Sequence, residues 1–141
     1  MTCYFDASAL VKRYVREPHS NAIARLLSAG TPVTSRMSEP EIASALARRH
    51  REGALTEEDR NRLVDGMRTD LASIYVVEIS PEVSSLACRL LLRHNLRAGD
   101  SLQLASALFL SSRASLKIRF VGFDENLNEA ARQEGLEVAS L

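Results

Sequence analysis

Two aspartates stand where short apolar runs end. Asp6 follows Cys3–Phe5 directly, and Asp124 follows Ile118–Phe123. Both runs have the length and composition of buried strands. In an open α/β sheet, ligands bind outside the carboxyl ends of the strands. The two aspartates are therefore candidates for a shared site at one edge of a sheet.

Two further acids stand near predicted helix starts. Glu41 follows Ser38-Glu39-Pro40, and Asp100 precedes the almost wholly apolar segment Ser101–Ser111. Helix N-termini can face the same sheet edge as the strand ends, so all four acids can converge on one pocket. Clustered carboxylates repel one another, and this repulsion raises their pKa values unless a cation compensates it.

Oxygen ligands of this kind suit one or two hard divalent cations, Mg²⁺ or Mn²⁺. Zinc would prefer His or Cys, and His19, His50 and His94 lie far apart in the sequence. Two metal ions about 4 Å apart can activate a water and stabilise the leaving oxygen in phosphodiester cleavage. The acidic pattern therefore indicates a metal-dependent nuclease.

Each acid also has a purely structural interpretation. Asp6 and Asp124 can cap the helices that follow them, and Asp6 taken alone favours this role. Ser38 and Glu41 have the spacing of a capping box. Asp100 can cap the helix that follows it, but a charge beside so apolar a helix usually needs a partner or a function. We therefore favour a functional role for Asp100.

Strand patterns alternate with helical patterns along the chain. Strands are predicted at Cys3–Phe5, Pro32–Thr34, Tyr75–Ile79, Ile118–Phe123 and Glu137–Ala139. Helices are predicted over Ala7–Arg16, Ser20–Gly30, Ser38 to about Gly53, Thr56 to about Ser73, Pro81 through Leu91, Ser101–Ser111 and Asn126–Gly135. This alternation predicts a three-layer α/β/α fold with a mainly parallel central sheet, and residues 1–141 form one domain without a linker or repeat.

The amino-acid composition limits which classes of protein the chain can belong to. The 141 residues are 45% hydrophobic and 26% charged, as in an ordinary globular domain. No apolar stretch approaches the roughly 20 residues of a membrane span, and no secretory signal is visible. Cys3 and Cys88 lie singly in apolar runs and are expected to be buried, reduced thiols. These features favour a cytoplasmic protein.

The net charge is zero, with 18 basic and 18 acidic residues. Without the four candidate site acids, 18 bases face 14 acids, so a metal-filled site would lie on a mildly basic body. Sixteen of the bases are arginine. Such a surface is compatible with holding a phosphate backbone.

Four segments carry a resemblance to a known family. They are Phe-Asp-Ala-Ser-Ala-Leu-Val-Lys, Pro-Glu-Ile-Ala-Ser-Ala-Leu, Arg-Ala-Gly-Asp-Ser-Leu-Gln-Leu-Ala-Ser-Ala-Leu and Phe-Val-Gly-Phe-Asp-Glu-Asn-Leu. Together they closely resemble the PIN-domain family, and within it a VapC-type toxin of a type II toxin–antitoxin pair. The resemblance covers nearly the whole chain, and the segment around Asp100 is its most specific part.

The resemblance implies a metal-dependent endoribonuclease. Mg²⁺ or Mn²⁺ would be held by Asp6, Glu41, Asp100 and Asp124, and hydrolysis of RNA would leave a 5′-phosphate and a 3′-hydroxyl. It also implies a homodimer and a VapB-type antitoxin whose tail covers the site. The apolar faces of Ser20–Gly30 and Ser38–Gly53 are the expected groove for that partner.

One position departs from the family pattern. The family often carries Thr or Ser two residues before the fourth acid, where this chain has Gly122. The missing hydroxyl leaves a rival hypothesis, a PIN-fold protein that binds RNA or a partner and cleaves little. A phosphatase of the haloacid-dehalogenase type is disfavoured, because Ser8 stands where that class needs a second aspartate. Ser8 is equally compatible with a bond to Asp6 and with a plain place in the first helical turn.

Overall fold

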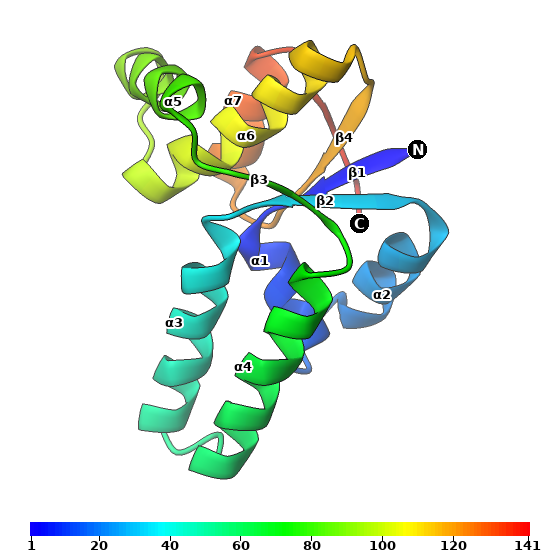
Figure 1. Cartoon of the computed structure of the whole chain (residues 1–141), viewed down its shortest axis with the longest axis vertical. Helices are drawn as coiled ribbons and strands as arrows, with labels where there is room; N and C mark the ends of the chain where they lie inside the picture. The colour runs from blue at the N-terminus through cyan, green and yellow to red at the C-terminus, as the bar shows by residue number, and fades with distance from the viewer.

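A five-stranded sheet runs through the middle of the structure, a computed structural model that describes all 141 residues (Figure 1). Its strands are β1 (Thr2–Phe5), β2 (Thr31–Ser35), β3 (Tyr75–Val77), β4 (Ile118–Val121) and β5 (Glu137–Val138). They are ordered β3-β2-β1-β4-β5, and every neighbouring pair is parallel. The predicted three-layer fold with a mainly parallel sheet is confirmed.

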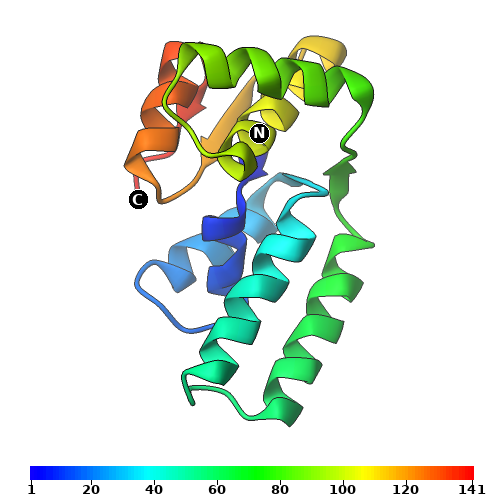
Figure 2. The same cartoon turned by 90° about the vertical axis from the view of Figure 1, so that its left-hand side faces the viewer.

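Helices cover both faces of the sheet (Figures 1 and 2). The helices are α1 (Ala7–Leu10, continued by a 3₁₀ turn at Val11–Arg13), α2 (Ser20–Ala29), α3 (Ser38–Arg51), α4 (Glu57–Leu71), α5 (Pro81–Arg93), α6 (Ala98–Ala114) and α7 (Glu125–Gln133). The first four pack on one face and the last three on the other. The hairpin of α3 and α4 extends away from the sheet.

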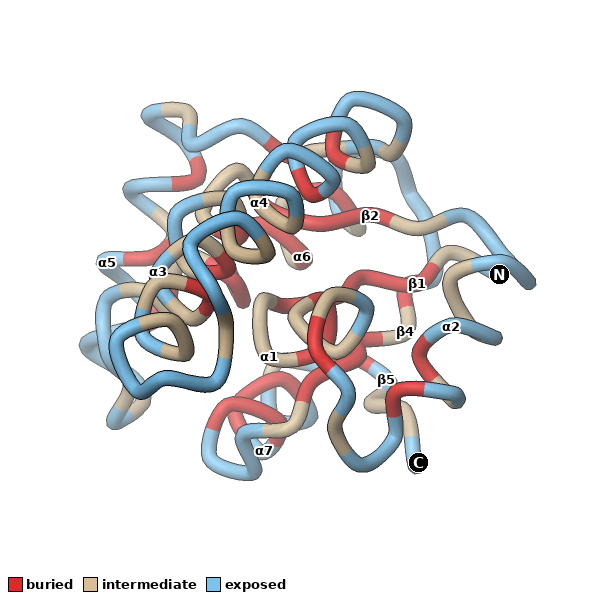
Figure 3. The backbone as a smooth tube through the Cα atoms, turned by 90° about the horizontal axis from the view of Figure 1, so that it is seen from below, coloured by how far each residue is buried: buried red, intermediate tan, exposed pale blue.

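The central strands β1 and β4 bury apolar side chains on both faces, because both faces of the sheet are covered. In β1, Tyr4 packs with the core under α5, α6 and α7, whereas Cys3 and Phe5 pack with the core under α1 to α4. Figure 3 shows this distribution, with buried positions in the strands and exposed positions on the outer turns of α4. The same packing explains why the strand runs show no clear polar alternation.

Burial separates the two cysteines. Cys3 is buried in β1 as predicted, but Cys88 is exposed, so the prediction of two buried thiols is wrong for Cys88. Val83, Ala87 and Leu90 form the buried stripe of α5. Cys88 follows Ala87 and is turned about 100° around the helix axis from it, toward solvent. No helix of the structure combines the length and the apolar character that a membrane crossing needs.

The strand order fixes the sheet edge at which a site can form. The chain leaves β1 toward β2 on one side, while β4 and β5 lie on the other side. The β1/β4 boundary is therefore the topological switch point, where α/β sheets bind ligands at their carboxyl ends. Helix α3 begins at this edge after β2. Helix α6 leads into β4, so its N-terminus returns to the same edge.

Candidate active site

Asp6 lies at the end of β1 and has the helix-capping role that the sequence favoured for it. It is the N-cap of α1, and its Oδ1 accepts hydrogen bonds from the Ala9 amide at 3.0 Å and the Ser8 hydroxyl at 2.7 Å. The residue is only 3% exposed. Two positions were considered for Ser8, a bond to Asp6 and a place in the first helical turn. The structure shows both.

Burial dominates the electrostatics of Asp6. It raises the pKa of this carboxyl from its ordinary value to about 7. The hydrogen bonds from Ser8 and Ala9 lower the pKa, while the charges of Glu41 and Asp100 raise it further. The pKa of Asp6 therefore depends on the charges of the carboxylates on α3 and α6.

Ser8 also links the ends of β1 and β4. While its hydroxyl donates to Asp6, its Oγ accepts from the Phe123 amide at 3.0 Å. Gly122 lies beside this bridge, and a Cβ built there would stand 2.6 Å from Asp6 Oδ2. The Asp6 carboxylate thus fills the space of a side chain at position 122, and Ser8 brings a hydroxyl to the same carboxylate.

Glu41 lies in the first turn of α3, but the capping-box interpretation is wrong. Met37 is the N-cap and makes no side-chain cap. The Ser38 hydroxyl points instead into the core, where it bonds Thr34 Oγ1 at 2.7 Å. Glu41 Oε1 accepts from Gln103 Nε2 of α6 at 2.9 Å. Burial raises the pKa of Glu41, the Gln103 bond opposes this, and the Asp100 charge adds to it.

Asp100 and Asp124 approach the edge from α6 and from the turn after β4. Helix α6 begins at Ala98 and not at Ser101, so Asp100 lies within the first turn and is not the N-cap. Burial raises the pKa of Asp100, and the Asp124 charge raises it further. Asp124 is exposed and caps α7, its Oδ1 accepting from the Leu127 amide at 3.1 Å.

A polar cavity of about 610 Å³ joins three of the four acids. Glu41, Asp100 and Asp124 line it, whereas Asp6 is not among its lining residues. Sequence reasoning missed three further polar residues of its wall, Asn95, Arg97 and Asn126. The position of Arg97, three residues before Asp100, was the available signal, because both flank the start of a buried helix.

The donor set fits a hydrated hard cation better than a fully caged one. No group of three or more His, Cys, Asp or Glu side chains is close enough to hold a metal ion by itself. Mg²⁺ usually binds through one or two carboxylates and keeps several waters, so this spacing is compatible with it. Burial and mutual repulsion raise the pKa of Asp6, Glu41 and Asp100, and a cation would relieve both costs.

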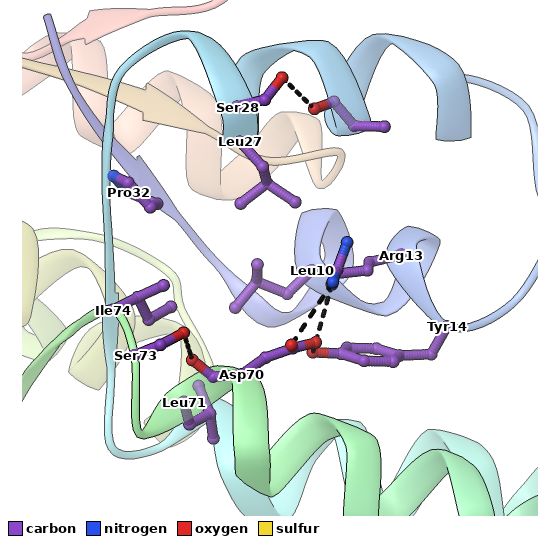
Figure 4. A pocket seen from close by; sticks show the side chains of 11 residues that line it. Leu10, Arg13, Tyr14, Leu27, Ser28, Pro32, Asp70, Leu71, Ser73 and Ile74 are labelled. Atoms are coloured by element: carbon purple, nitrogen blue, oxygen red, sulfur yellow. Dashed lines mark hydrogen bonds and ion pairs between the residues drawn. The ribbon is translucent and has the colours of Figure 1, made fainter.

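A second hollow lies on the α1–α4 side, between α2 and α4 (Figure 4). Its volume is about 220 Å³, and its apolar wall includes Leu10, Leu27 and Leu71. The apolar face of α3, which was predicted to form a groove with residues 20–30, is already buried in the core. Ile42 and Leu46 on that face lie in the core with α1 and α4.

Polar side chains close one end of this hollow. Asp70 of α4 accepts from Arg13 Nε and from the Tyr14 hydroxyl, both at 2.7 Å (Figure 4). Although burial raises the pKa of Asp70, the bonds from Arg13 and Tyr14 bring it below its ordinary value. Asp70 is therefore ionised at neutral pH and ties α4 to the turn after α1.

Known proteins resemble the chain over nearly its whole length. The family model described as PIN domain matches residues 3–133. Ribonuclease VapC46 of Mycobacterium tuberculosis is 33% identical over 135 residues, which cover 96% of this chain and 94% of that protein. Ribonuclease VapC49 of the same organism is 31% identical over 137 residues, covering 96% and 93%.

Solved structures share the fold at low identity. VapC20 of Mycobacterium tuberculosis, described as a sarcin-ricin loop cleaving toxin, has a TM-score of 0.68 at 16% identity and covers 91% of this chain and 94% of its own. VapBC2 from Rickettsia felis, bound to a DNA fragment from its promoter, has a TM-score of 0.67 at 14% identity and covers 100% and 99%.

Proposed function

Because the chain belongs to the PIN domain family and is related to VapC ribonucleases, we propose that it is a cytoplasmic endoribonuclease toxin. It would hydrolyse RNA phosphodiester bonds and be inhibited by a cognate VapB-type antitoxin. The observation that carries the proposal is the gathering of the acids at the β1/β4 switch point. Glu41, Asp100 and Asp124 line one cavity there, and the charges of Glu41 and Asp100 raise the pKa of Asp6.

The four acids would hold Mg²⁺ or Mn²⁺. When bound, such ions activate the attacking water and stabilise the leaving oxygen. Asp6 would act from a fixed position, because the Ser8 and Ala9 bonds hold its Oδ1. Asp100 and Asp124 lie nearer to solvent and would orient ions that keep part of their hydration.

Arg97 would hold the RNA backbone. It is the only basic side chain in the lining of the acidic cavity. A guanidinium can bind a phosphate through two parallel hydrogen bonds. The amides of Asn95 and Asn126 would provide neutral donors and acceptors beside it, which suits the sugar and base next to a bound phosphate.

The antitoxin would use the hollow between α2 and α4. Its apolar wall accepts an apolar segment of a partner, and it remains open while the face of α3 does not. Two of the structural neighbours with high TM-scores are described as VapBC assemblies, from Rickettsia felis and from nontypeable Haemophilus influenzae. An antitoxin partner for this chain is therefore the natural expectation.

Cleavage of total cellular RNA by the purified protein tests the function. The protein is incubated with Mn²⁺, with EDTA, and as the variants Asp100→Asn and Asp65→Asn. Asp65 is an exposed acid on α4, away from the cavity, and makes a matched control. We expect cutting with Mn²⁺ that EDTA abolishes, that Asp100→Asn loses and that Asp65→Asn retains.

Cleavage that survives thorough chelation would exclude this mechanism. RNA binding without cutting, after any co-purified partner has been removed, would favour the rival hypothesis of a binding protein. Gly122 was the sequence feature that favoured the rival. A side chain at this position would begin 2.6 Å from Asp6 Oδ2, so the glycine leaves room for that carboxylate.

A further inference from the structure

A buried chain of polar side chains lies directly behind the candidate active site. Gln103 stands at its centre, 1% exposed in helix α6, three residues after Asp100. Tyr4, Thr34 and Ser38 are fully buried around it. A buried amide loses its bonds to water and is costly unless each polar atom finds a partner. The partners of Gln103 therefore indicate what its side chain does.

Both ends of the Gln103 amide are engaged. Its Oε1 accepts from the Tyr4 hydroxyl at 2.6 Å. Its Nε2 donates to Glu41 Oε1 at 2.9 Å and to Ser38 Oγ at 3.1 Å. The amide thus has one partner for its oxygen and two for its nitrogen, and Glu41 is the one partner that also lines the cavity.

The direction of every bond in the chain is determined. Thr34 Oγ1 donates to the Phe5 carbonyl at 2.6 Å, so it must accept from Ser38. Ser38 has then used its only proton and must accept from Gln103. An ionised Glu41 can only accept. The amide nitrogen must face Ser38 and Glu41, and the amide oxygen must face Tyr4.

The chain of bonds connects the elements that carry three of the acids. The Phe5 carbonyl belongs to the residue before Asp6, Ser38 and Glu41 share the first turn of α3, and Gln103 follows Asp100 on α6. Gln103 and Asp100 are one turn apart and lie on the same side of the helix. A displacement of the Gln103 side chain would therefore change contacts on both α3 and α6.

We propose that Gln103 is a positioning residue that holds the carboxylate of Glu41 toward the acidic cavity, and that Tyr4 fixes the orientation of the Gln103 amide. The proposal rests on the proposed function, since it assumes that Glu41 is a metal ligand. Residues that orient metal ligands through hydrogen bonds typically change metal affinity or activity by about 10- to 100-fold when they are removed.

Manganese binding measured by calorimetry tests the role. Gln103→Met keeps the length of the side chain but leaves Glu41 and Ser38 without the donor. Tyr4→Phe keeps the ring that stacks on Phe120 but frees the amide oxygen. We expect roughly 10- to 100-fold weaker Mn²⁺ binding for Gln103→Met and a smaller loss for Tyr4→Phe.

Leu110→Val is the matched control, a core truncation on the same helix with no polar partner. It should lower Tm while keeping Mn²⁺ affinity within about twofold of the wild type, well short of the effect of a lost orienting residue. If Gln103→Met and Tyr4→Phe lower Tm but also bind Mn²⁺ like the wild type, the positioning role is wrong. If Gln103→Met does not fold, Tyr4→Phe decides the question.

The side-chain amide resonances of Gln103 give a readout that needs no metal. In the metal-free wild type we expect them to be protected from exchange, and to shift in both Glu41→Gln and Tyr4→Phe. The proposed contact would be wrong if the Gln103 amide hydrogens exchange freely with solvent, or if their resonances do not shift in either variant. If the wild type shows these protected Gln103 resonances but does not bind Mn²⁺, the contact exists and the metal site does not. That result would contradict the proposed function, on which the positioning role depends.

Discussion

The carboxylate of Asp6 fills the space in which a side chain at position 122 would begin. A Cβ on Gly122 would lie 2.6 Å from Asp6 Oδ2, 3.0 Å from its Cγ and 3.2 Å from its Oδ1. Asp6 has little freedom to turn away, because Ala9 and Ser8 hold its Oδ1. The glycine thus leaves room for this position of the carboxylate, and its backbone does not have a positive φ.

Gly122→Ala is expected to displace the Asp6 carboxylate and to lower RNA cleavage. A displacement of about 1 Å at a reacting site can cost on the order of 100-fold in rate. Gly66→Ala on α4 is the control, because a Cβ there meets nothing within 4 Å and alanine is the better helix former. Cleavage by Gly122→Ala at the wild-type rate would show that Asp6 tolerates the methyl group.

The stability of the metal-free protein should fall as the pH rises from about 4 to 7. Burial raises the pKa of Asp6 to about 7 in the folded state, well above its value in the unfolded chain. Within this window the folded state binds more protons, so its free energy of unfolding decreases with pH, by at most about 1.4 kcal/mol per pH unit for one group. Urea unfolding at a series of pH values measures the slope.

Asp6→Asn isolates the contribution of Asp6 to that slope. The amide oxygen of asparagine can still cap α1, while the titrating proton is gone. We expect a flatter dependence between pH 4 and 7 and greater stability than the wild type at pH 7. The pKa values of Glu41 and Asp100 are also raised, so these two acids likewise make the free energy of unfolding fall as the pH rises. Some pH dependence of the stability therefore remains in Asp6→Asn. An unchanged slope in Asp6→Asn would contradict the buried, protonated state of Asp6.

Local patterns were sufficient to predict the fold. Apolar runs that end in Asp6 and Asp124 predicted strand ends, and the alternation with helices predicted a parallel sheet, which the structure confirms. These features are local, because an apolar run and the acid after it are neighbours in the chain. The order of the strands in the sheet could not be predicted from these local patterns. Only the structure shows that Asp6 and Asp124 follow the two strands at the switch point.

Contacts between distant elements could not be predicted in the same way. The spacing of Ser38 and Glu41 favoured a capping box, but both side chains bind Gln103, more than 60 residues away. The partner groove was expected between the apolar faces of residues 20–30 and 38–53, but the apolar face of α3 is covered by the packing of α1 and α4. In both cases a tertiary contact outweighed a local preference.

Ser8→Ala is expected to weaken cleavage while leaving the fold intact. The substitution removes the donor to Asp6 Oδ1 and leaves the Phe123 amide without its acceptor. Loss of the donor raises the pKa of Asp6 further, because the Ser8 bond lowers it. The optimum for cleavage should therefore move to higher pH. A pH profile identical to that of the wild type would mean that Ser8 serves only the helical turn.

Leu27→Asp is expected to abolish antitoxin binding without loss of nuclease activity. Leu27 lies in the wall of the hollow between α2 and α4, which Asp70 also lines (Figure 4). A second acid there would meet an apolar partner segment with an unpaired charge, which is costly to bury. Leu92→Asp is the control, because Leu92 is 90% exposed on α5, on the opposite side of the sheet. Co-purification with the cognate antitoxin and cleavage of free RNA measure the two properties separately. If Leu27→Asp still retains the antitoxin while Leu92→Asp loses it, the partner binds on the α5 side and the hollow has another role.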